Sequence, residues 1–273
     1  MTLMLKLRAQ PPARVAATAL IPDRLEGLAA HEVAALTMRC GSEMVAVGDL
    51  FDVAGQPGPP LVLAGDLSRL DGIGAGMSRG RILVEGACGN HLGARMSGGE
   101  IDVAGDVGAW AGGEMSGGLL RIWGDAGARL GGAYPGVRVG MTGGEIVITG
   151  DAGEEAGAGM RRGLVMALGR AGNGAGLRML AGTVIALGGI GAEAGLGNKR
   201  GSLVSGTPVE LLPGYGFAAR YRPPALRLQL LRARDLWLRI DDAHVNGSWA
   251  RWSGDRTELG RGEILIFDPE GGI

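Results

Sequence analysis

The sequence contains few of the residues on which most active sites and most globular cores depend. Aromatic residues make up only 4% of the 273 positions, which excludes an ordinary aromatic-packed core over most of the chain. The two cysteines, Cys40 and Cys88, are too few and too far apart to indicate a disulfide framework or a zinc site. The three histidines make no pair with metal-binding spacing, and we expect the His91 imidazole to be solvated or locally bonded.

Long apolar runs and an excess of one charge are also missing. No segment reaches the roughly 18 uninterrupted apolar residues of a membrane span. Residues 1–10 lack the apolar core of a signal peptide, so we expect a cytoplasmic protein without a membrane partner. The formal net charge is −1, which provides no argument for a nucleic-acid partner.

Glycine, in contrast, is abundant, with 54 residues. Glycine-rich loops can cradle phosphates, but the strings Gly72-x-Gly74-x-Gly76 and Gly189-x-Gly191 lack the spacing of a dinucleotide fingerprint, and no G-x-x-x-x-G-K-[ST] motif is present. The glycines belong to a repeat instead. Six full copies of a 19-residue unit run from residue 81 to residue 201, one of them lengthened by seven residues, and a looser copy over residues 60–80 precedes them.

The copies share columns of identical residues. Glycine stands at the sixth, ninth, thirteenth and nineteenth places of every full copy. Apolar residues at the second and fourth places alternate with other residues, as in a short strand with one buried face. A further column is formed near the end of each copy by Met96, Met115, Met141, Met160, Met179 and finally Asn198. We expect these methionines to point into the fold and to contact one another.

A fixed period with one short strand per copy is typical of a solenoid, in which each coil buries its face only by stacking on its neighbours. The leucine and asparagine ladder of a leucine-rich repeat is missing. We therefore predict an all-β solenoid, a right-handed parallel β-helix of about seven 19-residue coils. Its glycine columns mark corners that need positive φ or pass close to the coil above. The seven extra residues around 133–139 are predicted to form an extruded loop, on a binding face or simply at the surface.

Both ends of a solenoid need a cover. We assign residues 1–58 to an N-terminal capping segment, 59–205 to the glycine-repeat β-helix and 206–273 to a C-terminal capping and interaction segment. The first is expected to contain a strand near 4–7, a helix near 28–36 and a strand pair at 44–47 and 50–53. The last contains three of the five tryptophans, which indicate a second small core or a partner surface.

The later coils carry apolar residues on both sides of the strand, at Met166, Leu168, Ile185 and Leu187. A contiguous apolar patch of this kind marks an interface, so we predict that it is covered by the C-terminal segment or by another subunit.

Chemistry-bearing side chains are sparse. Asp106, Asp125 and Asp151 share one column, where three carboxylates could bind a cation or protonate in turn. The favoured interpretation is that each accepts backbone N–H bonds within its own turn. No nucleophile, base and oxyanion grouping can be assembled, so we predict no catalytic residue and no metal site in this chain.

The repeat G-x-x-G-x-x-x-G-x-x-M-x-x-G over residues 60–205 resembles the β-helix shared by the C-terminal domain of the glutamate synthase large subunit and the C subunit of formylmethanofuran dehydrogenase. The chain length, Gly48-Asp49-Leu50-Phe51 and the run from Gly254 to Leu265 look like the group of stand-alone C subunits, which includes the C subunit of formyltransferase/hydrolase complexes.

This resemblance implies a non-catalytic structural subunit. Such complexes transfer a formyl group from formyl-tetrahydromethanopterin to a methanofuran-type cofactor and hydrolyse it to formate in one-carbon oxidation. The implied partners are an amidohydrolase-like subunit that holds zinc, a formyltransferase subunit and one further subunit. The alternatives are a glutamate-synthase-like scaffold domain or the C subunit of a redox formylmethanofuran dehydrogenase.

A basic edge is the one candidate site. Each of its members lies one or two places before the closing glycine of a copy, so stacking should bring several of them to one rim: Arg79, Arg161, Arg162, Lys199 and Arg200. This rim could be balanced by carboxylates of another subunit. Alternatively, the rim could attract the γ-glutamyl tail that the resemblance implies for the methanofuran-type cofactor.

Overall fold

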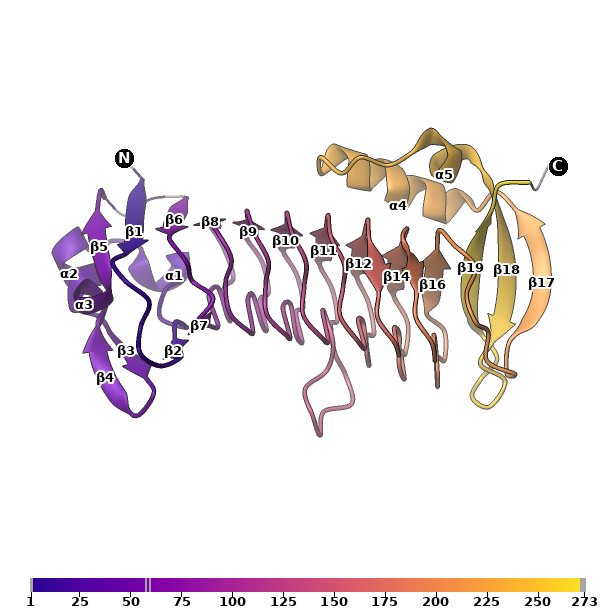
Figure 1. Cartoon of the computed structure of the whole chain (residues 1–273), viewed down its shortest axis with the longest axis horizontal. Coiled ribbons are helices and arrows are strands. Elements are labelled where there is room, and N and C mark those ends of the chain that lie inside the picture. The colour runs from indigo at the N-terminus through magenta and orange to yellow at the C-terminus, as the bar shows by residue number, and fades with distance from the viewer. Residues whose placement is uncertain (1, 57, 59, 271–273) are drawn as a thin grey trace.

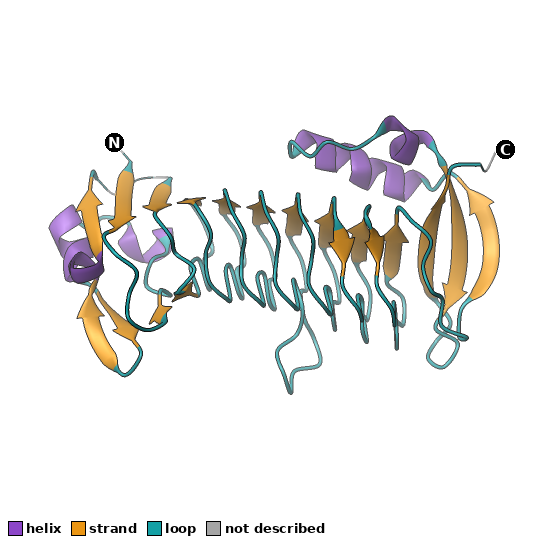
Figure 2. Ribbon diagram, viewed as in Figure 1, coloured by secondary structure: helices purple, strands orange, loops and turns teal. Residues whose placement is uncertain are grey.

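A computed structural model of the chain describes residues 2–56, 58 and 60–270, and it is a long rod with a small folded unit at each end (Figure 1). One strand of each copy contributes to a single stack. These strands are β6 (Leu61–Ala64), β8 (Arg81–Glu85), β9 (Glu100–Val103), β10 (Leu119–Ile122), β11 (Glu145–Ile148), β12 (Leu164–Ala167), β14 (Thr183–Ala186) and β16 (Ser202–Ser205). Figure 2 shows that they lie along one side of the rod and that loops complete each coil.

The strands pair in parallel, with equivalent places of the repeat opposite one another. Leu120 of β10, for example, pairs with Ile101 of β9 on one side and with Ile146 of β11 on the other. Two very short strands, β13 (Arg170–Ala171) and β15 (Gly189–Ile190), pair in the same way on a second side of the rod. The prediction of a mostly β architecture with a long stack of parallel strands is confirmed; the described residues also contain a few helices.

The interior is filled by the columns that the sequence singles out. Apolar residues at the second and fourth places are buried, and each methionine of the column from Met96 to Met179 has 0% exposure. Asn198, which replaces the methionine in the last full copy, is equally buried; its side chain donates to Gly201 O (2.9 Å) and accepts from Gly201 N–H (2.7 Å). The predicted inward direction of the methionine column is confirmed.

The glycine columns have two separate causes. At the nineteenth place the backbone is crowded and, except at Gly201, has positive φ: Gly144 has φ +90°, and a Cβ there would lie 2.7 Å from Met115 Cε of the preceding coil. At the sixth place crowding acts alone except at Gly86, where φ is also positive (144°). A Cβ on Gly150 would lie 2.8 Å from the carbonyl carbon of Gly124 and would collide with the Asp125 carboxylate. Both columns therefore exclude side chains because the coils pass so close to each other.

The N-terminal unit extends the stack and then closes it. β1 (Leu3–Leu7) pairs in parallel with β6, and β5 (Phe51–Ala54) pairs antiparallel with β1. A second sheet has the order β4-β3-β2-β7. The remaining elements of this region are β2 (Val15–Ala16), α1 (Pro22–Leu25), α2 (Ala30–Ala35), β3 (Thr37–Cys40), β4 (Glu43–Ala46), α3 (Val47–Leu50) and β7 (Leu70–Asp71).

The predicted pairing of strand 44–47 with strand 50–53 is wrong. Strands form near both places, but β4 pairs with β3 whereas β5 pairs with β1. The cause is local: the Asp49 carboxylate accepts a hydrogen bond from Ala46 N–H (3.0 Å) and begins the helical turn α3 where a hairpin turn was expected. The two strands therefore leave in different directions.

The C-terminal unit also joins the stack. β19 (Gly262–Asp268) pairs in parallel with β16, and β18 (Ser248–Gly254) and β17 (Gly216–Tyr221) follow as antiparallel strands. Two helices, α4 (Pro224–Asp235) and α5 (Asp242–Asn246), lie over the outer face of the stack (Figure 1).

Helix α4 covers the apolar outer face of the later coils. Met166 and Ile185 are buried in one cluster with Leu226 and Leu230 of α4, and Leu168 and Leu187 pack against its margin. The prediction that the C-terminal segment covers this patch is confirmed. Of the tryptophans in this segment, Trp249 is 1% exposed inside the second core whereas Trp237 is 78% exposed, so the segment has both a core and an aromatic side chain in solvent.

Candidate functional site: the edge that carries the insertion loop

The insertion loop, residues 133–139, leaves the rod between β10 and β11 without disturbing the stack (Figure 1). Its two ends meet. A Cβ placed on Gly140 would lie 2.9 Å from the carbonyl carbon of Gly132. Ala133 N–H donates to Ala158 O and Gly140 N–H donates to Gly159 O, each at 2.9 Å, so both ends are tied to the next coil.

One side of the loop is held by an aromatic cluster. The Tyr134 hydroxyl lies 2.8 Å from His91 Nδ1, and the Tyr134 ring stacks on Trp110 with 6.0 Å between ring centroids. His91 and Trp110 stack on each other at 5.4 Å, and the Arg95 guanidinium lies 5.4 Å from the Tyr134 ring centre while it pairs with Glu114. Burial lowers the pKa of His91 and raises the pKa of Tyr134, so both side chains are neutral near pH 7.

His91 is hydrogen-bonded, one of the two states expected, but its partner lies 43 residues further along the chain. His91 and Trp110 have φ of 62° and 56°, and the equivalent residues of the next two coils, Arg129 and Glu155, are also left-handed. This backbone turns a column of large side chains outward. The repeat indicates the column, but only the insertion supplies the tyrosine that packs on it.

A groove of about 550 Å³ lies on the other side of the loop. It is lined by loop residues that include Tyr134, Val137 and Arg138 and by edge residues of the coils that follow. Two of its cations are paired: Arg129 with Glu155 (2.7 Å) and Lys199 with Glu258 (3.4 Å). Leu177, Arg178 and Leu180 also line the groove.

The structure brings four of the five predicted rim residues close together in the stack. Arg161 and Arg162 end one coil, and Lys199 and Arg200 end the next coil but one. Lys199 lines the groove. Arg161, Arg162 and Arg200 are exposed, and no ion pair joins them to any acidic residue in the part of the chain that the structure describes.

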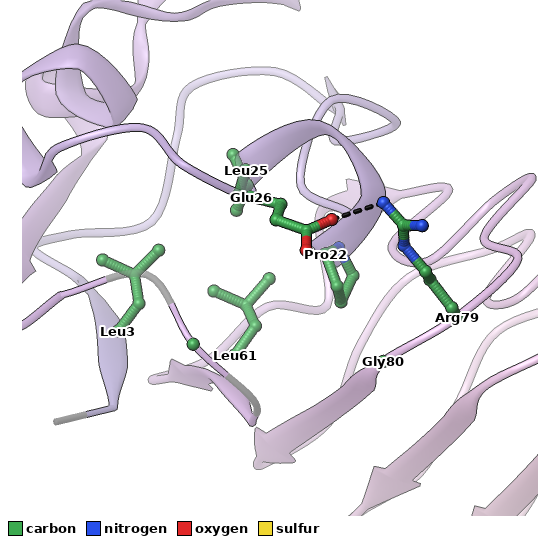
Figure 3. A pocket seen from close by; sticks show the side chains of 8 residues that line it. Leu3, Pro22, Leu25, Glu26, Leu61, Arg79 and Gly80 are labelled. Carbon is green, nitrogen blue, oxygen red and sulfur yellow. Dashed lines mark hydrogen bonds and ion pairs between the residues drawn. The ribbon is translucent and has the colours of Figure 1, made fainter.

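Arg79 lies apart from the other four. It ends the first copy, four coils from Arg162, a separation of about 19 Å at roughly 4.8 Å per coil. Its guanidinium pairs with Glu26 of the N-terminal unit at the side of an apolar pocket of about 400 Å³ lined by Leu3, Leu25 and Leu61 (Figure 3). A side chain that is paired and this distant does not share a ligand of ordinary size with the other four.

The aspartate column has a structural use that differs from the predicted one. Asp106 Oδ1 accepts from Asp125 N–H (2.8 Å), Asp125 Oδ1 from Asp151 N–H (2.8 Å), and Asp151 Oδ1 from Arg170 N–H (2.7 Å). Each carboxylate thus caps the next coil, whereas a bond within its own turn was expected. Asn90 and Asn173 do the same for a second column, with bonds to Ala109 N–H (2.9 Å) and Ala192 N–H (3.0 Å).

A second surface feature lies on the outer sheet face near β8–β10. Arg81 and Arg121 pair with Asp102 and Glu100 there, beside the exposed side chains of Trp123 and Trp237. Burial alone would raise the pKa of Asp102, but hydrogen bonds and charge from Arg121 and Arg81 together hold it below its usual value. The charges of this network are balanced within the chain.

Over residues 2–56, 58 and 60–270, no group of three or more His, Cys, Asp or Glu side chains has an arrangement that could hold a metal ion. None of the helices in the same residues has the length and the apolar composition that crossing a membrane needs.

Comparison with known proteins was made at the level of family models, curated proteins and solved structures. No family model matches the chain. A segment of 88 residues is 37% identical to the C subunit of the formyltransferase/hydrolase complex Fhc of Methylorubrum extorquens; it covers 32% of this chain and spans only 33% of that curated relative. A chain in the crystal structure of the formyltransferase/hydrolase complex (FhcABCD) from Methylorubrum extorquens, in complex with methylofuran, superposes with a TM-score of 0.89 at 35% identity, over 96% of this chain and 98% of that one.

Proposed function

The chain belongs to the family of the C subunits of formyltransferase/hydrolase complexes, and from this premise we propose that it is the non-catalytic structural subunit of such a complex. The observation that carries the proposal is the similarity to one chain of the FhcABCD structure over nearly the whole length of both chains. The complex would transfer a formyl group from formyl-tetrahydromethanopterin to a methanofuran-type cofactor and hydrolyse it to formate. Its other members would be a zinc-holding amidohydrolase-like subunit, a formyltransferase subunit and a further subunit.

The use of the polar side chains supports a scaffold role. The aspartate and asparagine columns direct their oxygens to backbone N–H groups of neighbouring coils, and the interior is aliphatic and methionine-filled. The winding belongs to the same proposal: a right-handed rod of about seven coils, supported by the in-register stacking of the copies.

Co-expression tests this proposal. The tagged chain and the other subunits encoded beside it are purified together, and the partners are identified by mass spectrometry. We expect a hetero-oligomer that transfers and hydrolyses the formyl group, while the isolated chain does neither. Purification of this chain without partners, or activity of the isolated chain once contaminants are excluded, would contradict it.

A second proposal concerns the basic rim. We propose that Arg161, Arg162 and Arg200, with Lys199, attract the carboxylate-bearing tail of the methanofuran-type cofactor, since three of these cations have no acidic partner in the described residues. Each exposed pair is worth only about 0.2–1 kcal/mol. Several such pairs along a tail would raise its local concentration and leave it mobile, and the effect should fade with salt.

The test of the rim is a variant with all four cations neutralised, assayed in the complex with long-tailed and tail-less cofactor. Turnover with the long-tailed cofactor should fall selectively. The matched control is Arg79→Gln, because Arg79 is a rim residue four coils away and should leave both rates unchanged. Equal losses with both cofactors, or no loss with either, would show that the rim does not hold the tail.

A further inference from the structure

The groove beside the insertion loop has an unbalanced charge. Arg138 on the loop and Arg178 on the coil edge both line it, both are exposed, and neither has an acidic partner in the described part of the chain. The other two cations of the groove are already paired with Glu155 and Glu258. Two guanidinium groups without an acidic partner in the described residues, one on the loop and one on the coil edge, favour an occupant that carries carboxylates, which guanidinium binds through paired hydrogen bonds.

The same groove has an apolar lining where other coils are polar. Leu180 is an apolar residue that lines the groove and is only partly buried. The equivalent residues of other copies are polar or charged: Ser97, Ser116, Thr142, Arg161 and Lys199. Leu177 is the neighbour of Leu180 in the lining, and Val137 on the loop is 45% exposed. An inorganic anion would use none of this apolar surface, whereas a peptide segment would use all of it.

The loop wall of the groove is held in place before anything binds. Tyr134 joins the loop to His91 and Trp110, and both loop ends bond to the coil that carries Ala158. A surface that is ordered in advance loses little conformational entropy on binding, so modest contacts suffice.

We infer that this groove docks an extended acidic segment of a partner subunit, with an apolar side chain between Leu180 and Val137 and carboxylates on Arg138 and Arg178. This inference rests on the proposed function, because it assigns the surface through which the subunit joins its complex. The two arginines assigned to this segment are not rim residues; Lys199 borders both surfaces, but it is paired with Glu258.

The test is co-expression of the Arg138→Glu/Arg178→Glu variant with the other subunits of the same complex. The amount of co-purified partner should fall about tenfold or more, because carboxylates would then face carboxylates. The control is Arg24→Glu/Arg39→Glu, which makes the same change in charge at two exposed arginines of the N-terminal unit and should assemble normally. The neutral variant Arg138→Gln/Arg178→Gln should also recover less partner while its thermal midpoint stays unchanged. That combination shows that binding, and not folding, is lost.

A photo-reactive amino acid at Val137 identifies the occupant. Cross-linking to a partner segment that contains Asp or Glu supports the inference. Normal assembly of the charge-reversed variant, a cross-linked segment without acidic residues, or a groove that retains only a small carboxylate compound in native mass spectra would overturn it. If the wild-type chain assembles with nothing, the proposed function itself has failed, which is a distinguishable result.

Discussion

In the interior of the rod, equivalent places of successive coils are filled by buried residues of similar character, whereas along the loop-bearing edge the residue type changes from one coil to the next. The column from Met96 to Met179 is methionine in five successive copies, and all five side chains are fully buried. One place later, the edge column contains Ser116, Thr142, Arg161, Leu180 and Lys199. Stacking of the coils requires similar residues only in the buried columns of the interior. The departures at the edge therefore point to contacts with something outside the rod.

The largest effect should come from the methionine column. Replacing Met115 by alanine removes a fully buried side chain that fits against Gly144 of the next coil. We expect a loss of about 2–5 kcal/mol in the free energy of unfolding, measured by denaturant titration. Ser116→Ala, at the exposed neighbouring place, should cost far less. Equal stability of the Met115→Ala variant and the wild type would show that the buried methionine column does not stabilise the rod more than the edge column does.

A glycine of the sixth-place column should come next. In Gly150→Ala the new Cβ meets the backbone of Gly124 and the Asp125 carboxylate, so we expect a cost of about 1–3 kcal/mol. Gly136→Ala is the control: nothing lies within 4 Å of a Cβ there and only the positive φ matters, which costs about 1 kcal/mol. If the two variants unfold at the same denaturant concentration, close approach of the coils is not what selects glycine.

The aspartate ladder should have a smaller effect. Asp125→Ala removes the acceptor for Asp151 N–H, at a cost of about 0.5–1.5 kcal/mol in unfolding free energy. Asp125→Asn keeps an acceptor oxygen, and Asn90 already makes the equivalent bond in its own column. The asparagine variant should therefore unfold close to the wild type. A loss as large as that of the alanine variant would mean that the charge matters more than the bond.

The smallest effect should appear in the pH dependence of the edge. Burial holds the pKa of His91 below its ordinary value, so protonation favours the unfolded chain. The stabilisation that His91 provides should be complete above about pH 6.5 and decline as the pH falls through the lower folded-state pKa. Thermal midpoints measured from about pH 7.5 to about pH 5.5 should fall less in His91→Phe than in the wild type. If the thermal midpoints of the two proteins fall equally with pH, protonation of His91 does not affect stability.

The repeat made the interior predictable because each column occurs many times: the inward methionines, the stacked strands and the covered patch at Met166 and Ile185 all follow from residues in register. Contacts that occur once could not be found in this way. The bond between Tyr134 and His91 and the ion pair between Arg79 and Glu26 depend on how a loop and a terminal unit fold back on the rod. The prediction for Asp125 named the wrong donor, because the period of the repeat does not reveal whether the N–H group comes from the same coil or from the next one.

The most direct measurement is removal of the loop itself. Deleting residues 133–139 joins Gly132 to Gly140, whose backbones already lie side by side, and leaves a 19-residue coil like its neighbours. We expect a folded rod with nearly the wild-type thermal midpoint that co-purifies with the other subunits at about a tenth of the wild-type level or less. A shortened chain that still assembles as well as the wild type would contradict the claim that the departures from the repeat, and not the repeat, make the subunit part of its complex.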